Sequence, residues 1–267
     1  GHDFAAAAAE QGASVIVAEK QVEVKDTASV VYVRDTRTAM EEIAPYFFDY
    51  PSRQMRVIAV TGTNGKTTST HIIAHLLQLA GYKTGVIGTV HMLIGSQSYP
   101  THNTTPDTAD LQKMLYQMVQ AGVTHVCMEV SSHALAMNRI AGCEFDTAVF
   151  TNLTEDHLDF HKTMDNYADA KAILFRMVSS KGQYKKEKTA VINADDPYAK
   201  VMTDAVADTA FCPIHTYAVD HDADLKAEQI RIGSKSTSFI LNDGGKKRTV
   251  ETKLAGRFNV YNTLASI

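Results

Sequence analysis

The segment Val60–Thr68, VTGTNGKTT, has the residue types of a loop that binds phosphate groups. It follows the apolar run Arg56–Val60 and precedes a segment with helical periodicity. Glycines let backbone N–H groups approach phosphate oxygens, and a helix N-terminus favours negative charge. Lys66 would then reach the β- and γ-phosphates of ATP, and the Thr67 hydroxyl would bind Mg²⁺. A glycine turn with an incidental lysine is the simpler alternative, but the order of strand, glycines, Lys-Thr and helix argues against it.

One position departs from the usual spacing of such loops, which would place a first glycine where this chain has Val60. Only Gly62-x-x-Gly65-Lys66-Thr67 is present. A P-loop NTPase switch or transporter would keep the full spacing and would place a Walker-B aspartate at a strand end, and neither is clear here. The loop alone therefore predicts ATP binding by a less common variant.

Two further segments carry groups that suit a substrate or a metal ion. Asn103–Asp107 (NTTPD) places small hydroxyls and an amide before a predicted helix, which suits a phosphate, carboxylate or sugar. An ordinary helix cap by Asp107 explains the same spacing, and spacing alone favours it. Glu129 ends an apolar strand, where α/β sheets place functional groups. Its carboxylate would hold Mg²⁺ opposite the phosphate loop or simply lie in solvent.

The segment Phe150–His161 (FTNLTEDHLDFH) and the helix after it carry another group of polar residues. His157 and His161 are four residues apart, as in a zinc-binding pair on a helix. The HExxH order is absent, and ATP chemistry calls for Mg²⁺, which prefers oxygen ligands. A polar surface turn is the remaining alternative. For Lys171, periodicity alone predicts a surface lysine whose stem packs along the protein.

The elements that position these residues alternate between apolar strands and amphipathic helices. This alternation predicts an α/β fold, a mostly parallel sheet with helices on both faces. Beyond Asp220, short strands around the turn Asn242–Gly245 predict a β-hairpin. One predicted helix, Thr67–Ala80, has Ile72, Ile73, Leu76, Leu77 and Ala80 on its apolar face. The expected strands are Arg56–Val60, Thr84–Gly88, His125–Val130, Thr147–Phe150 and Thr189–Asn193, and the other helices are Thr108–Gln120 and Asp165–Val178.

The first part of the chain has its own strands and helices. Phe4–Gln11 and Thr36–Phe48 have helical patterns, and Ser14–Ala18 and Val30–Val33 are predicted to be short buried strands. Pro51-Ser52 marks a boundary. We therefore expect two domains: residues 1–52, part of a small α/β N-terminal domain, and residues 53–267, a central ATP-binding domain.

Composition excludes several classes of protein. With 267 residues and 45% hydrophobic residues, the chain is expected to be soluble, cytoplasmic and globular. No apolar run approaches the roughly 20 residues of a membrane span, and the start shows no signal peptide. A net charge of −4 without a basic block gives no support for nucleic-acid binding. The three cysteines, Cys127, Cys143 and Cys212, form no disulfide framework or CxxC pair, and Cys127 is expected to be buried.

The string TGTNGKTT resembles the phosphate loop of the Mur ligase superfamily, which forms peptide-like bonds through an acyl phosphate. That superfamily includes the peptidoglycan Mur ligases, folylpolyglutamate synthase and part of cyanophycin synthetase, and the loop does not choose among them. NTTPD, MEVSSHAL and TNLTEDHLDFH resemble the type that adds the third residue to the peptidoglycan peptide, the MurE type. The resemblance covers the whole chain and is densest between Val57 and Phe175.

The resemblance implies a role for individual residues. Lys66, Glu129, His157 and Lys171 would be catalytic. A first Mg²⁺ would be held by Thr67 and Glu129, and a second by His157 and by Lys171 after CO₂ has converted it to N6-carboxylysine. The residues implied to bind ATP are Gly62, Thr63, Asn64, Gly65, Lys66, Thr67, Thr68 and Asn259. Those implied to bind UDP-MurNAc-L-Ala-D-Glu are Asn103, Thr104, Thr105, Ser131 and Arg139.

Several neighbouring residues receive weaker assignments. Asp156 would support His157, and Asn193 and Asp195 would line the nucleotide site. Asn259 would contact adenine, although a helix N-cap explains it equally well. Met137 stands where some relatives carry a polar substrate contact, so that contact is not carried over. The resemblance implies no role for Asp159 or His161.

The implied reaction joins a diamino acid to UDP-MurNAc-L-Ala-D-Glu and converts ATP to ADP and phosphate, in a monomer of the bacterial cytoplasm that binds neither nucleic acid nor membrane. Both ends of the chain look cut, and the domain that selects lysine or meso-diaminopimelate is expected to be missing. The 267-residue chain alone is therefore expected to turn over little substrate. A regulatory module on an inactive ligase scaffold is a rival, and the intact Lys66, Thr67, Glu129, His157 and Lys171 argue against it.

Overall fold

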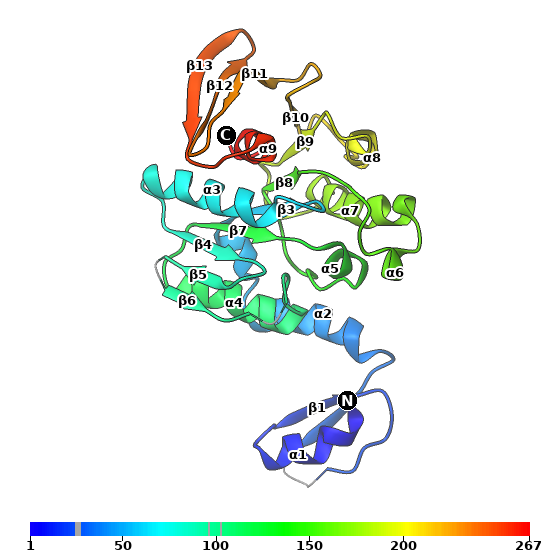
Figure 1. Cartoon of the computed structure of the whole chain (residues 1–267). Coiled ribbons are helices and arrows are strands. Elements are labelled where there is room, and N and C mark those ends of the chain that lie inside the picture. Colours follow the sequence, from blue (N-terminus) through cyan, green and yellow to red (C-terminus); the bar gives the residue numbers. More distant parts are fainter. Residues whose placement is uncertain (25–27, 96, 102) are drawn as a thin grey trace.

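The computed structural model describes residues 1–24, 28–95, 97–101 and 103–267 (Figure 1). The strands are β1 (Val15–Ala18), β2 (Ser29–Tyr32), β3 (Arg56–Thr61), β4 (Thr84–Ile87), β5 (Met92–Ile94), β6 (Gln97–Tyr99), β7 (His125–Glu129), β8 (Thr147–Phe150), β9 (Thr189–Asn193), β10 (Ile214–Ala218), β11 (Leu225–Ile232), β12 (Thr237–Asp243) and β13 (Lys246–Thr252). The α-helices are α1 (Ala5–Glu10), α2 (Thr36–Phe47), α3 (Lys66–Leu79), α4 (Thr108–Gln120), α5 (Ser132–Ala136), α6 (Leu158–His161), α7 (Met164–Val178), α8 (Ala199–Asp204) and α9 (Arg257–Leu264), and the 3-10 turns are η1 (His2–Phe4) and η2 (Pro51–Gln54).

Within this described part, eleven strands form one sheet in the order β13-β12-β11-β10-β9-β8-β3-β7-β4-β5-β6. The strands from β4 to β11 in this order are parallel, and the two edges are antiparallel. Parallel neighbours need crossovers, which α3, α4 and α7 help to supply. The predicted mostly parallel α/β sheet is confirmed.

The register brings three strand ends to one edge of the sheet. Val60 of β3 lies opposite Glu129 of β7 and opposite Val149 of β8. Because parallel strands end at the same edge, the loops after β3, β7 and β8 lie side by side. The phosphate loop, the Glu129 carboxylate and the segment after Phe150 therefore share one edge.

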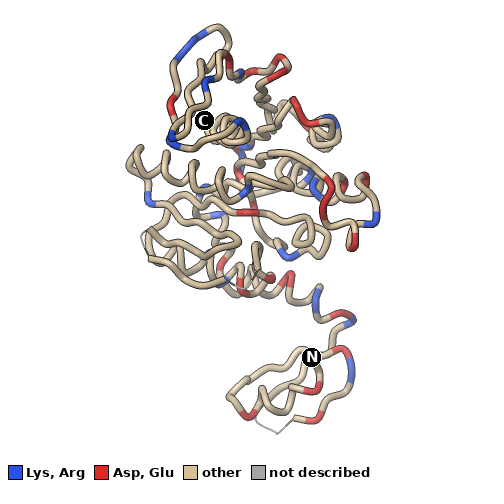
Figure 2. Tube along the Cα trace, in the orientation of Figure 1, with Lys and Arg blue, Asp and Glu red and all other residues tan. Residues whose placement is uncertain are grey.

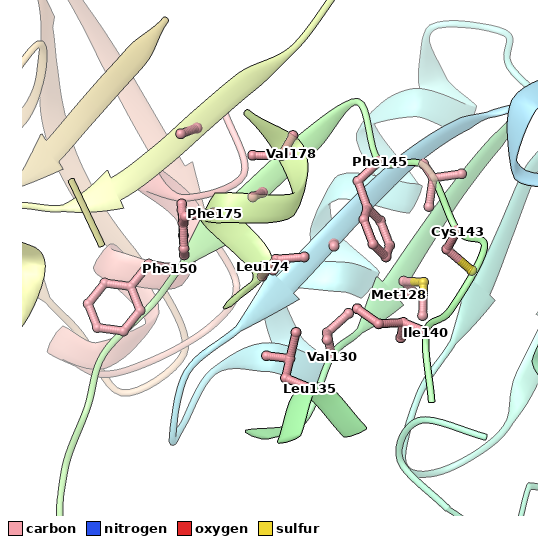
Figure 3. Close-up of a cluster of buried hydrophobic side chains, with 14 of the residues drawn as sticks. Met128, Val130, Leu135, Ile140, Cys143, Phe145, Phe150, Leu174, Phe175 and Val178 are labelled. Carbon is pink, nitrogen blue, oxygen red and sulfur yellow. The ribbon is translucent and has the colours of Figure 1, made fainter. Parts of the chain in front are cut away.

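Side chains that alternate along the strands form two hydrophobic cores, one on each face of the sheet. On one face, Val57 and Ala59 pack with residues of α4, α5 and α7. Figure 3 shows part of this core, with Met128, Phe145, Leu174 and Phe175 converging between strand and helix. On the other face, Val60 and Cys127 pack with residues of α3 and α9. The burial predicted for Cys127 is confirmed, and burial raises the pKa of its thiol to about 12.

A small unit of β1, β2 and α1 stands apart from the large sheet in Figure 1. The two predicted strands are confirmed, and Ala18 is buried, but the burial predicted for the others was wrong: Val15, Val31 and Tyr32 are 47–55% exposed. The sheet has only two described strands, and α1 packs against β1, so most of its surface remains uncovered. The next helix, α2, packs on α4 of the large unit.

Other differences from the sequence predictions are local. The β5–β6 hairpin, β10 and the short helices α5, α6 and α8 were not predicted. In α3, Ile73 is buried as expected, but Leu76 is 41% exposed because the helix turns Ser69, Thr70 and Ala74 toward the sheet instead. None of the helices described in this chain is long and apolar enough to span a membrane.

Candidate nucleotide and metal site

The phosphate loop between β3 and α3 has the backbone shape that its glycines allow. Gly62 has φ +150° and Gly65 has φ +88°. A Cβ at Gly62 would lie 1.9 Å from Thr151 Oγ1, and one at Gly65 would lie 2.3 Å from Asn262 Oδ1. Only glycine fits at these two positions, because both space and backbone conformation exclude a side chain.

The segment after β8 braces this loop. Thr63 N donates to the carbonyl of Asn152 at 2.8 Å, and Asn64 N donates to Asn152 Oδ1 at 2.9 Å. Thr151 Oγ1 donates to the carbonyl of Asn64 at 2.7 Å. The sequence analysis gave no role to Thr151 or Asn152, although both belong to the string TNLTEDHLDFH.

Replacing Gly62 with alanine should destabilise the fold, because the new Cβ would collide with a hydroxyl that is already bonded to Asn64. We expect the free energy of unfolding to fall by about 3 kcal/mol. Gly81→Ala is the matched control, since Gly81 also has positive φ (+91°) but no atom within 4 Å of its Cβ position, and should cost about 1 kcal/mol. Urea denaturation of both variants measures the difference, and equal losses would contradict the packing argument.

Two lysines from different helices converge on one carbonyl of the loop. Lys66 Nζ donates to the carbonyls of Gly62 and Thr63, at 2.8 and 2.9 Å. Lys171 Nζ, from α7, donates to the same Gly62 carbonyl at 3.0 Å. Burial lowers the pKa of both, and the positive charge of Lys66 lowers that of Lys171 further. The prediction of a surface lysine was wrong, since Lys171 is 1% exposed.

Lys171 is held between the loop and an aromatic ring. Its Nζ lies 4.4 Å from the ring centroid of Tyr167, and Tyr167 Oη lies 3.2 Å from Thr63 Oγ1. The ring of Tyr167 also stacks on that of His161, with centroids 4.9 Å apart. Burial and the neighbouring cation both oppose protonation of this amine, whereas the charge of Asp156 favours it.

Glu129 is the buried carboxylate of the site. It is 1% exposed, and Thr67 Oγ1 donates to its Oε1 at 2.9 Å. Thr89, just after β4, also bonds to it: Thr89 N donates to Oε1 at 3.0 Å and Thr89 Oγ1 to Oε2 at 3.1 Å. The sequence analysis did not identify Thr89. The alternative of a solvated strand end does not fit this buried carboxylate.

The histidines His133, His157 and His161 form a cluster of rings. His157 precedes α6 with φ +54°, and its ring lies 4.9 Å from that of His133. Its Nε2 is 3.5 Å from Asp156 Oδ2. His161 is buried beside Ser132 Oγ at 2.9 Å, and burial lowers its pKa to about 4. His157 and His161 thus have different polar partners, although both rings pack against those of His133 and Tyr167.

The donors present fit Mg²⁺ better than zinc. Thr67 Oγ1 and Glu129 Oε1 are adjacent oxygen donors, and oxygen is what Mg²⁺ prefers. Among the described residues, no three His, Cys, Asp or Glu side chains converge as a metal cluster would require.

The residues expected to contact the substrate fall into two groups. Thr105 is 1% exposed, donating from Oγ1 to the carbonyl of Glu129 at 2.9 Å and accepting from Ser131 N at 3.0 Å. Ser131 also caps α5 through Ala134 N. Asn103 is exposed, and Thr104 is half-buried with its hydroxyl 3.1 Å from that of Thr89. The roles of these residues toward substrate stay predictions.

Arg139 pairs with Asp107 rather than standing free. Its Nε lies 2.8 Å from Asp107 Oδ1. Asp107 occupies the N-cap position of α4, as predicted. Its side chain accepts no hydrogen bond from the helix backbone, so the prediction of a side-chain cap was wrong. Both residues line a pocket of about 480 Å³ that also contacts Arg37 and Met40 of α2.

The residues outside the loop that are expected to line the nucleotide site form hydrogen bonds within the protein. Asn259 lies in the first turn of α9 and is not its N-cap, which is Gly256, so the capping alternative was wrong. Asn259 Oδ1 accepts from Asn262 Nδ2 at 3.0 Å. Asp195 accepts from the backbone N–H groups of Val219, Asp220 and His221 and from Tyr261 Oη, and Asn193 Nδ2 donates to the carbonyl of Thr151.

Charge does not single out another surface of the molecule. Figure 2 shows acidic and basic positions interspersed over the fold. The run Lys246–Arg248 on β13 is a local exception, and Lys247 of this run pairs with Glu228 at 2.6 Å.

A parallel sheet with a glycine loop after one strand, a Lys-Thr helix start and a buried carboxylate after the neighbouring strand defines a P-loop α/β protein. Comparison with known proteins shows the family to which this protein belongs. The family described as the Mur ligase middle domain matches residues 60–267, and the chain belongs to the Mur ligase family.

Named relatives agree with this placement. The chain is 48% identical over 269 residues to the UDP-N-acetylmuramoyl-L-alanyl-D-glutamate–2,6-diaminopimelate ligase of Geobacillus kaustophilus, covering all of this chain and 53% of the relative. It is 43% identical to the ligase of the same name from Listeria monocytogenes. A solved structure of such a ligase superposes with a TM-score of 0.84 at 34% identity, covering 99% of this chain and 53% of that one. The chain thus spans about half the length of the curated relatives it matches.

A folylpolyglutamate synthase of Mycobacterium tuberculosis shares the fold at a TM-score of 0.67 and 16% identity, over 86% of this chain and 57% of that one. This likeness concerns the fold alone.

Proposed function

We propose that this chain is the ATP-binding part of a ligase that adds 2,6-diaminopimelate to UDP-MurNAc-L-Ala-D-Glu. The observation that carries the proposal is the convergence of Lys66, Lys171 and Thr67–Glu129 around one phosphate loop. The relatives at 42–48% identity are all named for this substrate and amino acid, which favours diaminopimelate over lysine. Residues 1–52 and 53–267 would be the two units, with α2 packed against the second.

In this proposal, the loop amides and the start of α3 bind the ATP phosphates. Lys66 exchanges its carbonyl partners for phosphate oxygens and offsets the charge that gathers there. Thr67 and Glu129 hold a first Mg²⁺, which supplies further charge compensation when bound. His157, supported by Asp156, and carboxylated Lys171 hold a second.

The substrate would be bound on the other side of Glu129. Asn103 and Thr104 offer polar groups there, and Arg139 stands beside the pocket shared with α2. A D-glutamyl carboxylate placed at the loop would take the γ-phosphoryl group, forming an acyl phosphate and ADP. The amine of diaminopimelate would then attack the acyl carbon, and phosphate would leave with one carboxylate oxygen.

Carboxylation of Lys171 is favoured because burial and the charge of Lys66 lower the pKa of its amine and so raise the share of the neutral form. The nitrogen lone pair attacks CO₂, a N–C bond forms, and one proton passes to solvent, leaving a carbamate anion. The ammonium of Lys66 and a bound Mg²⁺ would stabilise that anion. Burial of an amine among Tyr167, Gly62 and Lys66 supports this proposal.

The function is tested by phosphate release from ATP with the protein extended to the length of its relatives. Release should require UDP-MurNAc-L-Ala-D-Glu and diaminopimelate together, with L-lysine the poorer amine. Activity with a folate and glutamate, but not with the muramoyl dipeptide, would contradict the proposal. The reaction would belong to the bacterial cytoplasm, where ATP is available, and a monomer suffices for it.

A further inference from the structure

Thr89 packs directly against the carboxylate of Glu129. Its backbone N–H and its hydroxyl reach different oxygens of that carboxylate, at 3.0 and 3.1 Å. The preceding Gly88 leaves no room for a side chain, since a Cβ there would lie 2.1 Å from Glu129 Oε1. Thr89 itself is exposed, so its side chain is not needed to fill the core.

The same hydroxyl also faces the segment before α4. Thr89 Oγ1 lies 3.1 Å from Thr104 Oγ1. The next residue, Thr105, bonds to the main-chain carbonyl of Glu129 at 2.9 Å. Residues 103–105 are therefore linked to both the side chain and the backbone of Glu129, and Thr89 provides the side-chain link.

The Thr89 hydroxyl connects Glu129 and Thr104 through a single hydrogen. The Thr89 hydroxyl has one hydrogen, so donation to Glu129 and donation to Thr104 exclude each other. A cation that engages Glu129 competes with the Thr89 hydrogen for the carboxylate and turns that hydrogen toward Thr104, whereas without a cation Thr89 can donate to Glu129 and accept from the Thr104 hydroxyl. Two sites that bias one such element are coupled in both directions.

We propose that Thr89 is a positioning residue that couples residues 103–105 to Glu129. Through this coupling, binding of the muramoyl dipeptide changes the affinity for Mg²⁺–nucleotide, and binding of Mg²⁺–nucleotide changes the affinity for the dipeptide. This inference rests on the proposed function, because it takes Glu129 as the residue facing the Mg²⁺–nucleotide.

The test uses the 267-residue chain and the β,γ-imido analogue of ATP with Mg²⁺. Calorimetry gives the affinity, and hydrogen–deuterium exchange follows the amides of residues 103–105 and of Asp107 with and without the nucleotide. In the unmodified chain, nucleotide should slow exchange there about fivefold or more. Thr89→Val should remove this response, because it takes away the hydroxyl that joins Glu129 to Thr104.

Two controls separate coupling from general damage. Thr89→Ser keeps the hydroxyl and should restore the exchange response. Thr101→Val removes a different hydroxyl of the neighbouring chain, which bonds to the Gly88 carbonyl at 3.0 Å, and should leave the response intact.

An unchanged exchange response in Thr89→Val, or failure of Thr89→Ser to restore it, would overturn the inference while nucleotide binding upheld the proposed function. An unmodified chain that binds the nucleotide without any response at residues 103–107 would overturn it as well. A chain that binds no nucleotide would overturn both.

Discussion

Replacing Lys66 with methionine should weaken binding of Mg²⁺–ATP to this chain by about 10–100-fold, as expected when a hydrogen bond to a charged group is lost. Methionine keeps much of the side-chain volume but cannot donate to phosphate. The lysine is already aimed along the loop by the Gly62 and Thr63 carbonyls, so little reordering is needed when phosphate replaces them. Titration calorimetry with the imido analogue measures the loss.

The matched control for this prediction is Lys113→Met. Lys113 is an exposed lysine of α4, far along the chain from the loop. Both variants lose one positive charge, so a general electrostatic effect would weaken binding in both. Equal affinities of the Lys66 variant and the unmodified chain would contradict the assignment of Lys66 to phosphate.

Replacing Lys171 with methionine should abolish carbamate formation and reduce ligase turnover by about 10²–10³-fold. The carbamate is observed directly with carbon-13 bicarbonate, as a carbonyl NMR signal that requires the buried amine. The signal should be present in the unmodified chain and absent from the variant. A Mg²⁺-loaded crystal with an unmodified Lys171 amine would count against the carbamate.

Stability gives an independent check on the environment of Lys171. Burial and Lys66 place its folded-state pKa well below the unfolded value of 10.5. A lysine with a lowered folded pKa destabilises the fold below that pKa, and this cost fades as pH rises toward the unfolded value. In the absence of CO₂ and nucleotide, Lys171→Met should therefore be at least as stable as the unmodified chain at pH 7. A large loss of stability would show that the amine is favourably paired.

Much of the fold followed from local sequence signals. The strand Arg56–Val60, the glycine turn and the helix after it are adjacent in sequence, so their order alone predicts a phosphate loop. Glu129 was found because a polar residue ends an apolar strand, and parallel strands end at one edge of the sheet. Lys171 could be assigned only through family resemblance, since its helical periodicity suggested a surface position.

The features that escaped prediction depend on contacts between distant segments. Thr89 has no motif of its own and gains its place only because β4 pairs with β7. The exposure of Val31 and Tyr32 could not be read from their apolar character, because it depends on what covers the two-stranded sheet. Asn152 braces the loop from the segment that follows β8, a strand that lies beside β3 only in the folded sheet.

The central claim is transfer of the γ-phosphoryl group of ATP to the D-glutamyl carboxylate. It is tested most directly by supplying UDP-MurNAc-L-Ala-D-Glu with oxygen-18 in that carboxylate, together with ATP, diaminopimelate and the protein extended to the length of its relatives. The account predicts that the released phosphate carries one labelled oxygen and that the other stays in the new amide. Phosphate released without label would mean that water or another group attacks ATP, and it would contradict the account.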